Sequence, residues 1–159
     1  MKNNEKTNVM RVLEAKKIAY IPHLYQPDAS LSGSQIAELL GEKPERVFKT
    51  LVTQGKSGQH YVFVIPVEKE LDLKKAAKAA GEKSIAMIPQ KELLPLTGYV
   101  HGGCSPIGMK KAFPTFLHAS AEGAESICVS AGRVGFQVEL KPAELMAAAG
   151  CRAADLTAD

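Results

Sequence analysis

A glycine-rich loop at residues 97–111, TGYVHGGCSPIGMKK, carries the residue types best suited to chemistry. Glycines let a backbone approach a ligand closely, and Pro106 favours an extended backbone at Ser105. Such a loop presents backbone N–H groups, which can bind an ester carbonyl or the oxyanion that develops on it. A tight structural turn between two strands would use the same residues. The loop lacks the GxGxxG and GK[S/T] patterns, so binding of a nucleotide phosphate is not expected.

Lys49 is the second candidate, because it lies in the run RVFKTLV, which is apolar on both faces if it forms a strand. This pattern predicts a central strand, where a lysine needs a counter-charge, a cavity or solvent. In a pocket the ammonium can bind phosphate or stabilise negative charge on a reacting ester. Alternatively, the stem of Lys49 packs in the sheet and its ammonium reaches the rim.

Two hydroxyl residues and three basic residues complete the candidates. Tyr25 ends a predicted short strand, and Ser130 precedes the glycine-flanked turn AGRVG. Their hydroxyls can line a cleft, or they can pack and cap a turn. Arg133 at the tip of that turn is either a phosphate contact or a solvated charge. Lys110 and Lys111 adjoin the glycine loop, where they would suit the phosphates of a tRNA acceptor end.

No short spacing typical of metal ligands occurs among the four histidines and three cysteines, so we predict no metal site and no cofactor. His101 and Cys104 are close in sequence, but a nucleophilic pair also needs a geometry that sequence does not show. Ser105 lacks the GxSxG context of a serine hydrolase. An enzyme built on these residues would therefore work by positioning, desolvation and oxyanion stabilisation.

The composition is that of one globular domain spanning residues 1–159, with 45% hydrophobic and 23% charged residues. A net charge of +3 permits contact with a polyanion without requiring it. With 6% aromatic residues and no Trp, a single-stranded RNA binder built on base stacking is not expected. The polar N-terminus, the lack of a long apolar run and the odd number of cysteines predict a cytoplasmic protein without membrane contact.

The pattern of side chains predicts an α+β fold with a mixed, largely antiparallel sheet. Helices are expected at 7–17, 32–40, 71–80 and 142–149, with Ile36, Leu39 and Leu40 as the buried stripe of the second. Strands are expected at 18–25, with Pro22 marking an edge strand, and at 47–53, 60–66, 84–88, 115–118, 126–130 and 136–140. The second and third of these strands form the clearest hairpin.

The chain resembles the YbaK/EbsC family through the blocks VFKTLV, ELDLKKAAKAAG, TGYVHGGCSPIGMKK and ICVSAGRVGFQVEL, in that order. The resemblance runs from about Met10 to Asp155 and is strongest to Cys-tRNA(Pro) deacylases. It implies a curved, mainly antiparallel mixed sheet flanked by helices, with a pocket for the aminoacyl-adenosine end of tRNA. It also implies a transient complex with prolyl-tRNA synthetase, because a related domain is inserted in those synthetases.

The resemblance further implies roles for particular residues. The pocket residues would be Lys49 and Thr50, the loop residues Gly102, Gly103, Ser105 and Pro106, and Tyr25 and Ser130. Lys49 would anchor the terminal ribose or the amino-acid end, and the loop backbone would hold the carbonyl and its oxyanion. In the YbaK type the thiol of the substrate attacks its own ester carbonyl, so that no general base of the enzyme is needed.

Two departures from the family leave the substrate open. Gln137, in GFQVEL, stands where the YbaK type has an aspartate, and the segment at 25–32 is a little shorter. Cys-tRNA(Pro), Cys-tRNA(Cys) and tRNA charged with alanine or another small residue are therefore all candidates. A non-catalytic tRNA- or synthetase-binding module and a small-molecule esterase are the competing functions. The presence of Lys49 with an intact loop favours a deacylase, and Lys110 and Lys111 favour tRNA.

Overall fold

The computed structural model describes residues 5–158, so residues 1–4 of the polar start and the final residue lie outside the described part. A three-stranded antiparallel sheet has the order β1 (Ile21–Leu24), β7 (Phe136–Leu140), β6 (Ile127–Ser130). A five-stranded sheet has the order β4 (Ile85–Met87), β2 (Phe48–Gly55), β3 (His60–Pro66), β5 (Thr115–His118), β8 (Cys151–Ala154). In this second sheet β4, β2 and β3 are antiparallel, whereas β5 runs parallel to β3 and β8 parallel to β5.

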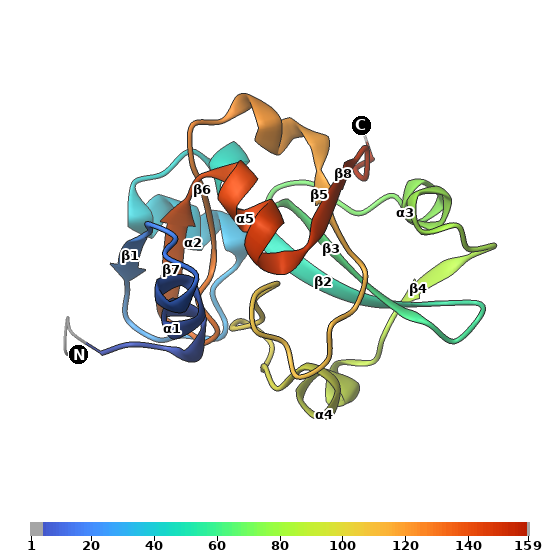
Figure 1. Cartoon of the computed structure of the whole chain (residues 1–159), viewed down its shortest axis with the longest axis horizontal. Helices are drawn as coiled ribbons and strands as arrows, with labels where there is room; N and C mark the ends of the chain where they lie inside the picture. The colour runs from blue at the N-terminus through green and yellow to red at the C-terminus, as the bar shows by residue number, and fades with distance from the viewer. Residues whose placement is uncertain (1–4, 159) are drawn as a thin grey trace.

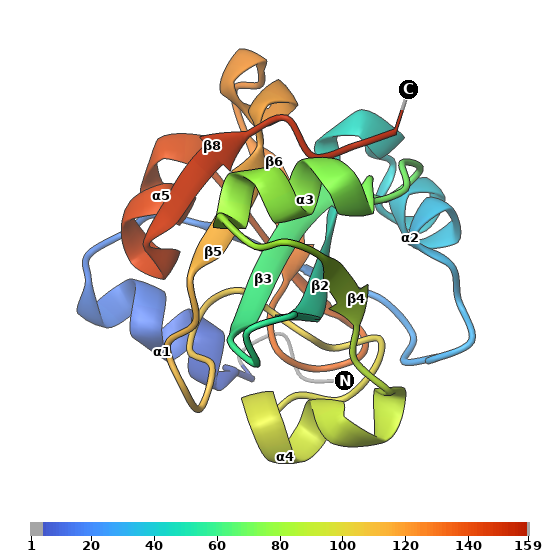
Figure 2. The same cartoon turned by 90° about the vertical axis from the view of Figure 1, so that its right-hand side faces the viewer.

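Helices cover both sheets (Figure 1). They are α1 (Asn8–Ala15), α2 (Gly33–Leu40), α3 (Leu73–Ala80), α4 (Leu93–Thr97) and α5 (Pro142–Ala149), with 3₁₀ turns at Pro44–Arg46, Gln90–Glu92 and Ala119–Gly123. Figure 2 shows α3 crossing one face of the five-stranded sheet, where Ala76 and Ala77 share a core cluster with Phe63. The larger core cluster joins Leu13 of α1 to residues of both sheets.

The two sheets meet at the start of β2. Val47, directly before β2, forms a parallel bridge with Cys128 of β6. The predicted α+β class and its mainly antiparallel pairing are confirmed, and the single sheet expected from sequence is divided into two sheets that touch at this bridge. The bridge brings the Lys49 end of β2 beside the β6–β7 hairpin.

Local signals in the sequence fix the helix ends. Thr7 caps α1 by accepting the amide of Met10 at 3.3 Å. Ser32 and Gln35 form a reciprocal capping box at the start of α2, which leaves fewer orphan N–H groups in its first turn. Gly41 ends the same helix at φ 68°, a conformation that glycine adopts without the steric cost of a Cβ.

Some sequence predictions needed correction. Leu39 is 58% exposed, and Ala37 takes its place in the buried stripe of α2. Successive helical residues turn by about 100° around the axis. Ala37 and Leu40 therefore lie toward the buried side of α2, and Leu39 lies outside it. The strand predicted from residue 18 begins only at Ile21, although its position at the sheet edge is confirmed. β8 was not predicted, since CRAA shows neither alternation nor β-branched residues.

No helix within residues 5–158 combines the length and apolar character that crossing a bilayer would require.

Candidate functional site

A cavity of about 280 Å³ lies where the start of β2, the first turn of α2, the glycine loop and the β6–β7 hairpin come together. We call it the Lys49 cavity. Five residues predicted to belong to the site line it: Lys49, Thr50, Gly102, Ser130 and Gln137. The other lining residues are Leu31, Ser32, Gly33, Ile36, Val47, Phe48, Leu51, Val67, Leu93, His101 and Cys104.

Lys49 is half-buried on β2, opposite Ile65 of β3. β2 is an interior strand, as predicted. Its neighbour β4 pairs only with residues 53–55, so β4 does not cover the edge of β2 at Lys49, and Lys49 lines the cavity. In the described part of the chain the ammonium has neither an ion-pair partner nor a hydrogen-bond acceptor. A half-buried cation without a partner is suited to bind a carbonyl, hydroxyl or phosphate oxygen of a ligand.

Three buried side-chain atoms have no hydrogen-bond partner among the described residues: Tyr25 Oη, Thr50 Oγ1 and Gln137 Oε1. Thr50 and Gln137 line the Lys49 cavity. Each such buried atom costs about 1–3 kcal/mol unless a ligand or water satisfies it. The two cavity atoms therefore mark a polar contact that the protein leaves open, whereas Tyr25 is buried without lining this cavity.

Only some backbone amides of the glycine loop are free to bind a ligand. Gly102 lines the cavity at φ 88°, in the region that glycine favours. The amide of Gly103 already donates to the carbonyl of Val100 at 3.0 Å, so it is not free to hold an oxyanion. Within residues 5–158, the amides of Gly102, Cys104 and Ser105 have no acceptor. Of these three residues only Gly102 and Cys104 line the cavity, so theirs are the loop amides placed to meet an oxyanion.

Three predicted loop residues lie behind the cavity wall. Gly103 is buried so tightly against the β6–β7 turn that a Cβ would stand 3.0 Å from the amide nitrogen of Val134. Ser105 is fully buried, and its hydroxyl accepts the amide of Ile107 at 3.2 Å. Pro106 is buried beside it. The arrangement indicates that these residues set the shape of the loop rather than contact a ligand.

Ser130 combines both of the roles considered from sequence. It lines the Lys49 cavity, and its hydroxyl accepts the amide of Gly132 at 3.2 Å, which caps the β6–β7 turn. The cap orients the serine at the cavity wall while leaving its hydroxyl proton available to a ligand.

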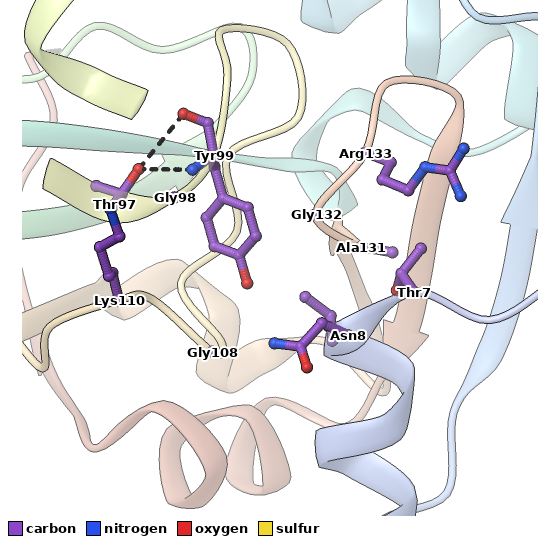
Figure 3. Close-up of a pocket in the computed structure, with 11 residues that line it drawn as sticks. Thr7, Asn8, Thr97, Gly98, Tyr99, Gly108, Lys110, Ala131, Gly132 and Arg133 are labelled. Atoms are coloured by element: carbon purple, nitrogen blue, oxygen red, sulfur yellow. Dashed lines mark hydrogen bonds between the residues drawn. The ribbon is translucent and has the colours of Figure 1, made fainter. Parts of the chain in front are cut away.

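Two of the predicted tRNA contacts lie at a separate cavity of about 400 Å³, which we call the Arg133 cavity. Figure 3 shows Thr97, Tyr99 and Lys110 on one side of it and Thr7 and Arg133 across from them. Arg133 pairs with Glu5 and stacks 4.8 Å from the Phe136 ring centroid, and Lys110 donates to the carbonyl of Pro95 at 3.4 Å.

Lys111 is exposed and lines neither cavity. The structure therefore does not bring the three predicted basic contacts together at the mouth of the Lys49 cavity.

Cys104 and His101 both line the Lys49 cavity, but the thiol is unsuited to attack. Burial raises the pKa of the Cys104 thiol to about 12, so it stays protonated at neutral pH. His101 is exposed. No carboxylate lies among the lining residues in the described chain. The cavity thus offers donors and acceptors for positioning and lacks an activated protein nucleophile.

Sequence reasoning missed the apolar part of the cavity, including Leu31, Ile36 and Leu93. Ile36 was assigned to the buried stripe of a helix, and Leu31 and Leu93 were not singled out. The one available signal was the capping box at Ser32, since it fixes where α2 begins and hence where its first turn points.

Fold and cavity together define a small α+β domain with a cavity of mixed polar and apolar lining at the junction of its two sheets. The aminoacyl-tRNA editing domain matches residues 27–148, and the chain belongs to this family. It is 45% identical over 157 residues to a candidate Cys-tRNA(Pro)/Cys-tRNA(Cys) deacylase, EbsC, of Enterococcus faecalis, covering 98% of this chain and 96% of that protein.

Solved structures agree in fold. A candidate trans-editing enzyme for prolyl-tRNA synthetase superposes with a TM-score of 0.82 at 24% identity, over 98% of this chain and all of that one (100%). The hypothetical protein APE2540 superposes with a TM-score of 0.87 at 24% identity, over 96% of this chain and 100% of that one. These two likenesses bear on the fold alone.

Proposed function

We propose that this chain is a free-standing editing deacylase that hydrolyses mischarged Cys-tRNA(Pro), and Cys-tRNA(Cys) as a second substrate, to free cysteine and tRNA. The observation that carries the proposal is the Lys49 cavity, whose lining combines a lysine and two buried oxygens that have no partner among the described residues. Family membership and the 45% identity to EbsC support the same substrate class. We also propose that the protein acts in the cytoplasm, where charged tRNA is used.

The cavity suits the end of an aminoacyl-tRNA in size and polarity. About 280 Å³ is enough to accommodate a small aminoacyl group. Gln137 Oε1 is an acceptor, which complements the N–H donors of the substrate α-ammonium. Gln137 thus keeps the acceptor of the family aspartate without its charge. Lys49 can donate to the terminal ribose or the ester, and Thr50 to either.

The chemistry is proposed to rest on the substrate. The cysteine thiol of the substrate attacks its own ester carbonyl, a C–S bond forms, and the C–O bond to the ribose breaks. The thiol proton passes to the departing ribose oxygen, and water then opens the cyclic thioester to free cysteine. The enzyme contributes positioning and stabilisation of the oxyanion by the amides of Gly102 and Cys104 and by Lys49. The protonated Cys104 and the lack of a cavity carboxylate among described residues favour this route.

The partners follow from the substrate. The acceptor end of tRNA is the proposed ligand, and it must reach the cavity past the exposed His101 and the first turn of α2. A transient complex with prolyl-tRNA synthetase is proposed because a structural relative is described as a trans-editing enzyme for that synthetase.

The test is hydrolysis of Cys-tRNA(Pro) and Ala-tRNA(Pro) by the purified full chain. Rapid loss of cysteine is expected, with little loss of alanine. A preference for alanine would move the substrate to the alanine-clearing relatives and exclude the substrate-thiol route. Hydrolysis of neither ester would leave the binding-module function in place of the deacylase.

A further inference from the structure

Four side chains of types that can bind a metal ion lie close together beside the Lys49 cavity, and they come from four separate segments. They are His23 of β1, Glu42 two residues after the end of α2, Cys128 of β6 and Glu139 of β7. Their donor atoms all lie within 4.8 Å of one another. The spread of these residues along the chain explains why no short ligand spacing marks them in the sequence.

The strand registers bring three of the donors to one face of the three-stranded sheet. Cys128 lies opposite Glu139, and His23 lies opposite Gln137. Because residues two apart on a strand share a face, His23, Cys128 and Glu139 project together. Glu42 joins them from the end of α2, where its amide donates to the carbonyl of Ala37 at 3.0 Å.

The cluster gathers more negative than positive groups. His23 Nε2 lies 2.8 Å from Glu139 Oε1, and the hydroxyl of Ser126 donates to the other oxygen of Glu139. The carboxyl of Glu42 also lies against Glu139. Among residues 5–158, no lysine or arginine forms an ion pair with either glutamate. Two carboxylates at such short range repel each other unless they share a proton or a cation.

We infer that His23, Glu42, Cys128 and Glu139 form a binding site for Zn²⁺. An imidazole nitrogen, a thiolate sulfur and carboxylate oxygens are the donors that Zn²⁺ prefers, whereas Mg²⁺ and Ca²⁺ take oxygen ligands almost exclusively. Four protein ligands complete a tetrahedral shell, which makes the site structural rather than catalytic. Binding deprotonates Cys128 and releases that proton to solvent. The hydrogen bond from Ser126 orients Glu139 in the manner of an outer partner of a metal ligand.

The position of the site gives it a consequence for the Lys49 cavity. Ser130 and Gln137 line the cavity from the same sheet face that carries Cys128 and Glu139. Glu42 follows α2, whose residue Ile36 forms another part of the wall. A metal bound to all four ligands ties the end of α2 to β1, β6 and β7, and so holds two sides of the cavity together.

The test uses the purified full chain, freed of metal with a chelator and titrated with Zn²⁺ alone. One ion per chain and a raised melting temperature are expected. Co²⁺ in its place is expected to give the intense thiolate-to-metal charge-transfer absorption of a sulfur ligand. Cys128→Ala is expected to abolish that absorption, and the matched variants Cys151→Ala and Cys104→Ala are expected to keep it.

Glu42→Gln provides a second variant should Cys128→Ala fail to fold, because Glu42 is only half-buried. It is expected to weaken Zn²⁺ binding by roughly 10-fold or more. Failure of the wild-type chain to bind Zn²⁺, or full binding by both variants, would overturn the inference. So would loss of the cobalt absorption in Cys104→Ala in place of Cys128→Ala, since the ion would then sit in the substrate cavity.

Discussion

The Lys49 cavity and the Arg133 cavity differ in how their polar groups are satisfied. In the Arg133 cavity the basic groups already have partners, Glu5 and Phe136 for Arg133 and the Pro95 carbonyl for Lys110. In the Lys49 cavity the ammonium, Thr50 Oγ1 and Gln137 Oε1 have none within the described chain. The comparison teaches that open hydrogen-bonding capacity, more than positive charge, distinguishes the cavity that we propose binds the substrate.

The strongest way to break this comparison is Lys49→Ala. We expect deacylation to fall by about 100-fold or more, the scale of losing one group that stabilises an oxyanion. The melting temperature is expected to change little, because the ammonium has no partner to lose among residues 5–158. Single-turnover hydrolysis and thermal unfolding would measure the two effects. Lys78→Ala, on the exposed side of α3, is the control, and equal activity of the two variants would refute the role of Lys49.

Thr50→Val sharpens the comparison, because it removes an unsatisfied hydroxyl at nearly constant shape. We expect the free energy of unfolding to rise by about 1 kcal/mol and deacylation to fall by about 10-fold. Denaturant unfolding and hydrolysis rates would measure both. Thr53→Val is the matched control on the same strand, since its hydroxyl donates to the Tyr61 carbonyl at 2.9 Å. That variant is expected to be less stable, and stabilisation of both variants would contradict the argument.

Substitutions in the Arg133 cavity are expected to have smaller effects. Lys110→Ala and Arg133→Ala should raise KM a few-fold through weaker contact with tRNA phosphates and leave kcat unchanged. Loss of the exposed Arg133–Glu5 pair should cost about 0.2–1 kcal/mol of stability. Steady-state kinetics at two salt concentrations would test this, and a fall in kcat as large as that of Lys49→Ala would abolish the distinction between the cavities.

Treatment with an alkylating reagent is expected to modify the cysteines slowly and to leave the activity unchanged. Burial raises the pKa of the Cys104, Cys128 and Cys151 thiols to about 12, so the reactive thiolate is scarce at pH 8. Incubation of the native chain with iodoacetamide, followed by mass spectrometry and a deacylation assay, would measure modification and activity together. Rapid inactivation at pH 8 would instead point to Cys104 as a nucleophile.

The elements that were predicted well from sequence depend on local interactions. Ser32, Gln35 and Gly41 fix the ends of α2 by themselves, and the β2–β3 hairpin needs only a short turn. The division into two sheets and the strand β8 were missed, since they depend on pairing with distant partners. For β8, the partner β5 supplies the order that its own residues do not specify.

The candidate site was also predicted only in part, because its local elements follow from the sequence and its long-range contacts do not. The apolar residues on both faces of the run around Lys49 predicted an interior strand, and the structure brings Lys49 to one cavity with Thr50 and Gln137. Long-range packing decides the roles of the other predicted residues. Gly103 and Ser105 form hydrogen bonds within the loop itself, and Arg133 pairs with Glu5, which is 128 residues away in sequence. A residue type reveals what a group can do, but only its neighbours reveal whether that capacity remains free.

The antiparallel pairing of β1 with β7 also has a consequence for synthesis of the chain. His23 and Glu139 are 116 residues apart, so one sheet joins an early segment to a late one. Contacts of such long sequence separation form slowly and only after both partners have left the ribosome. The cavity wall that carries Ser130 and Gln137 is therefore assembled near the end of translation, and nascent chains that stop before β7 should lack this wall of the Lys49 cavity.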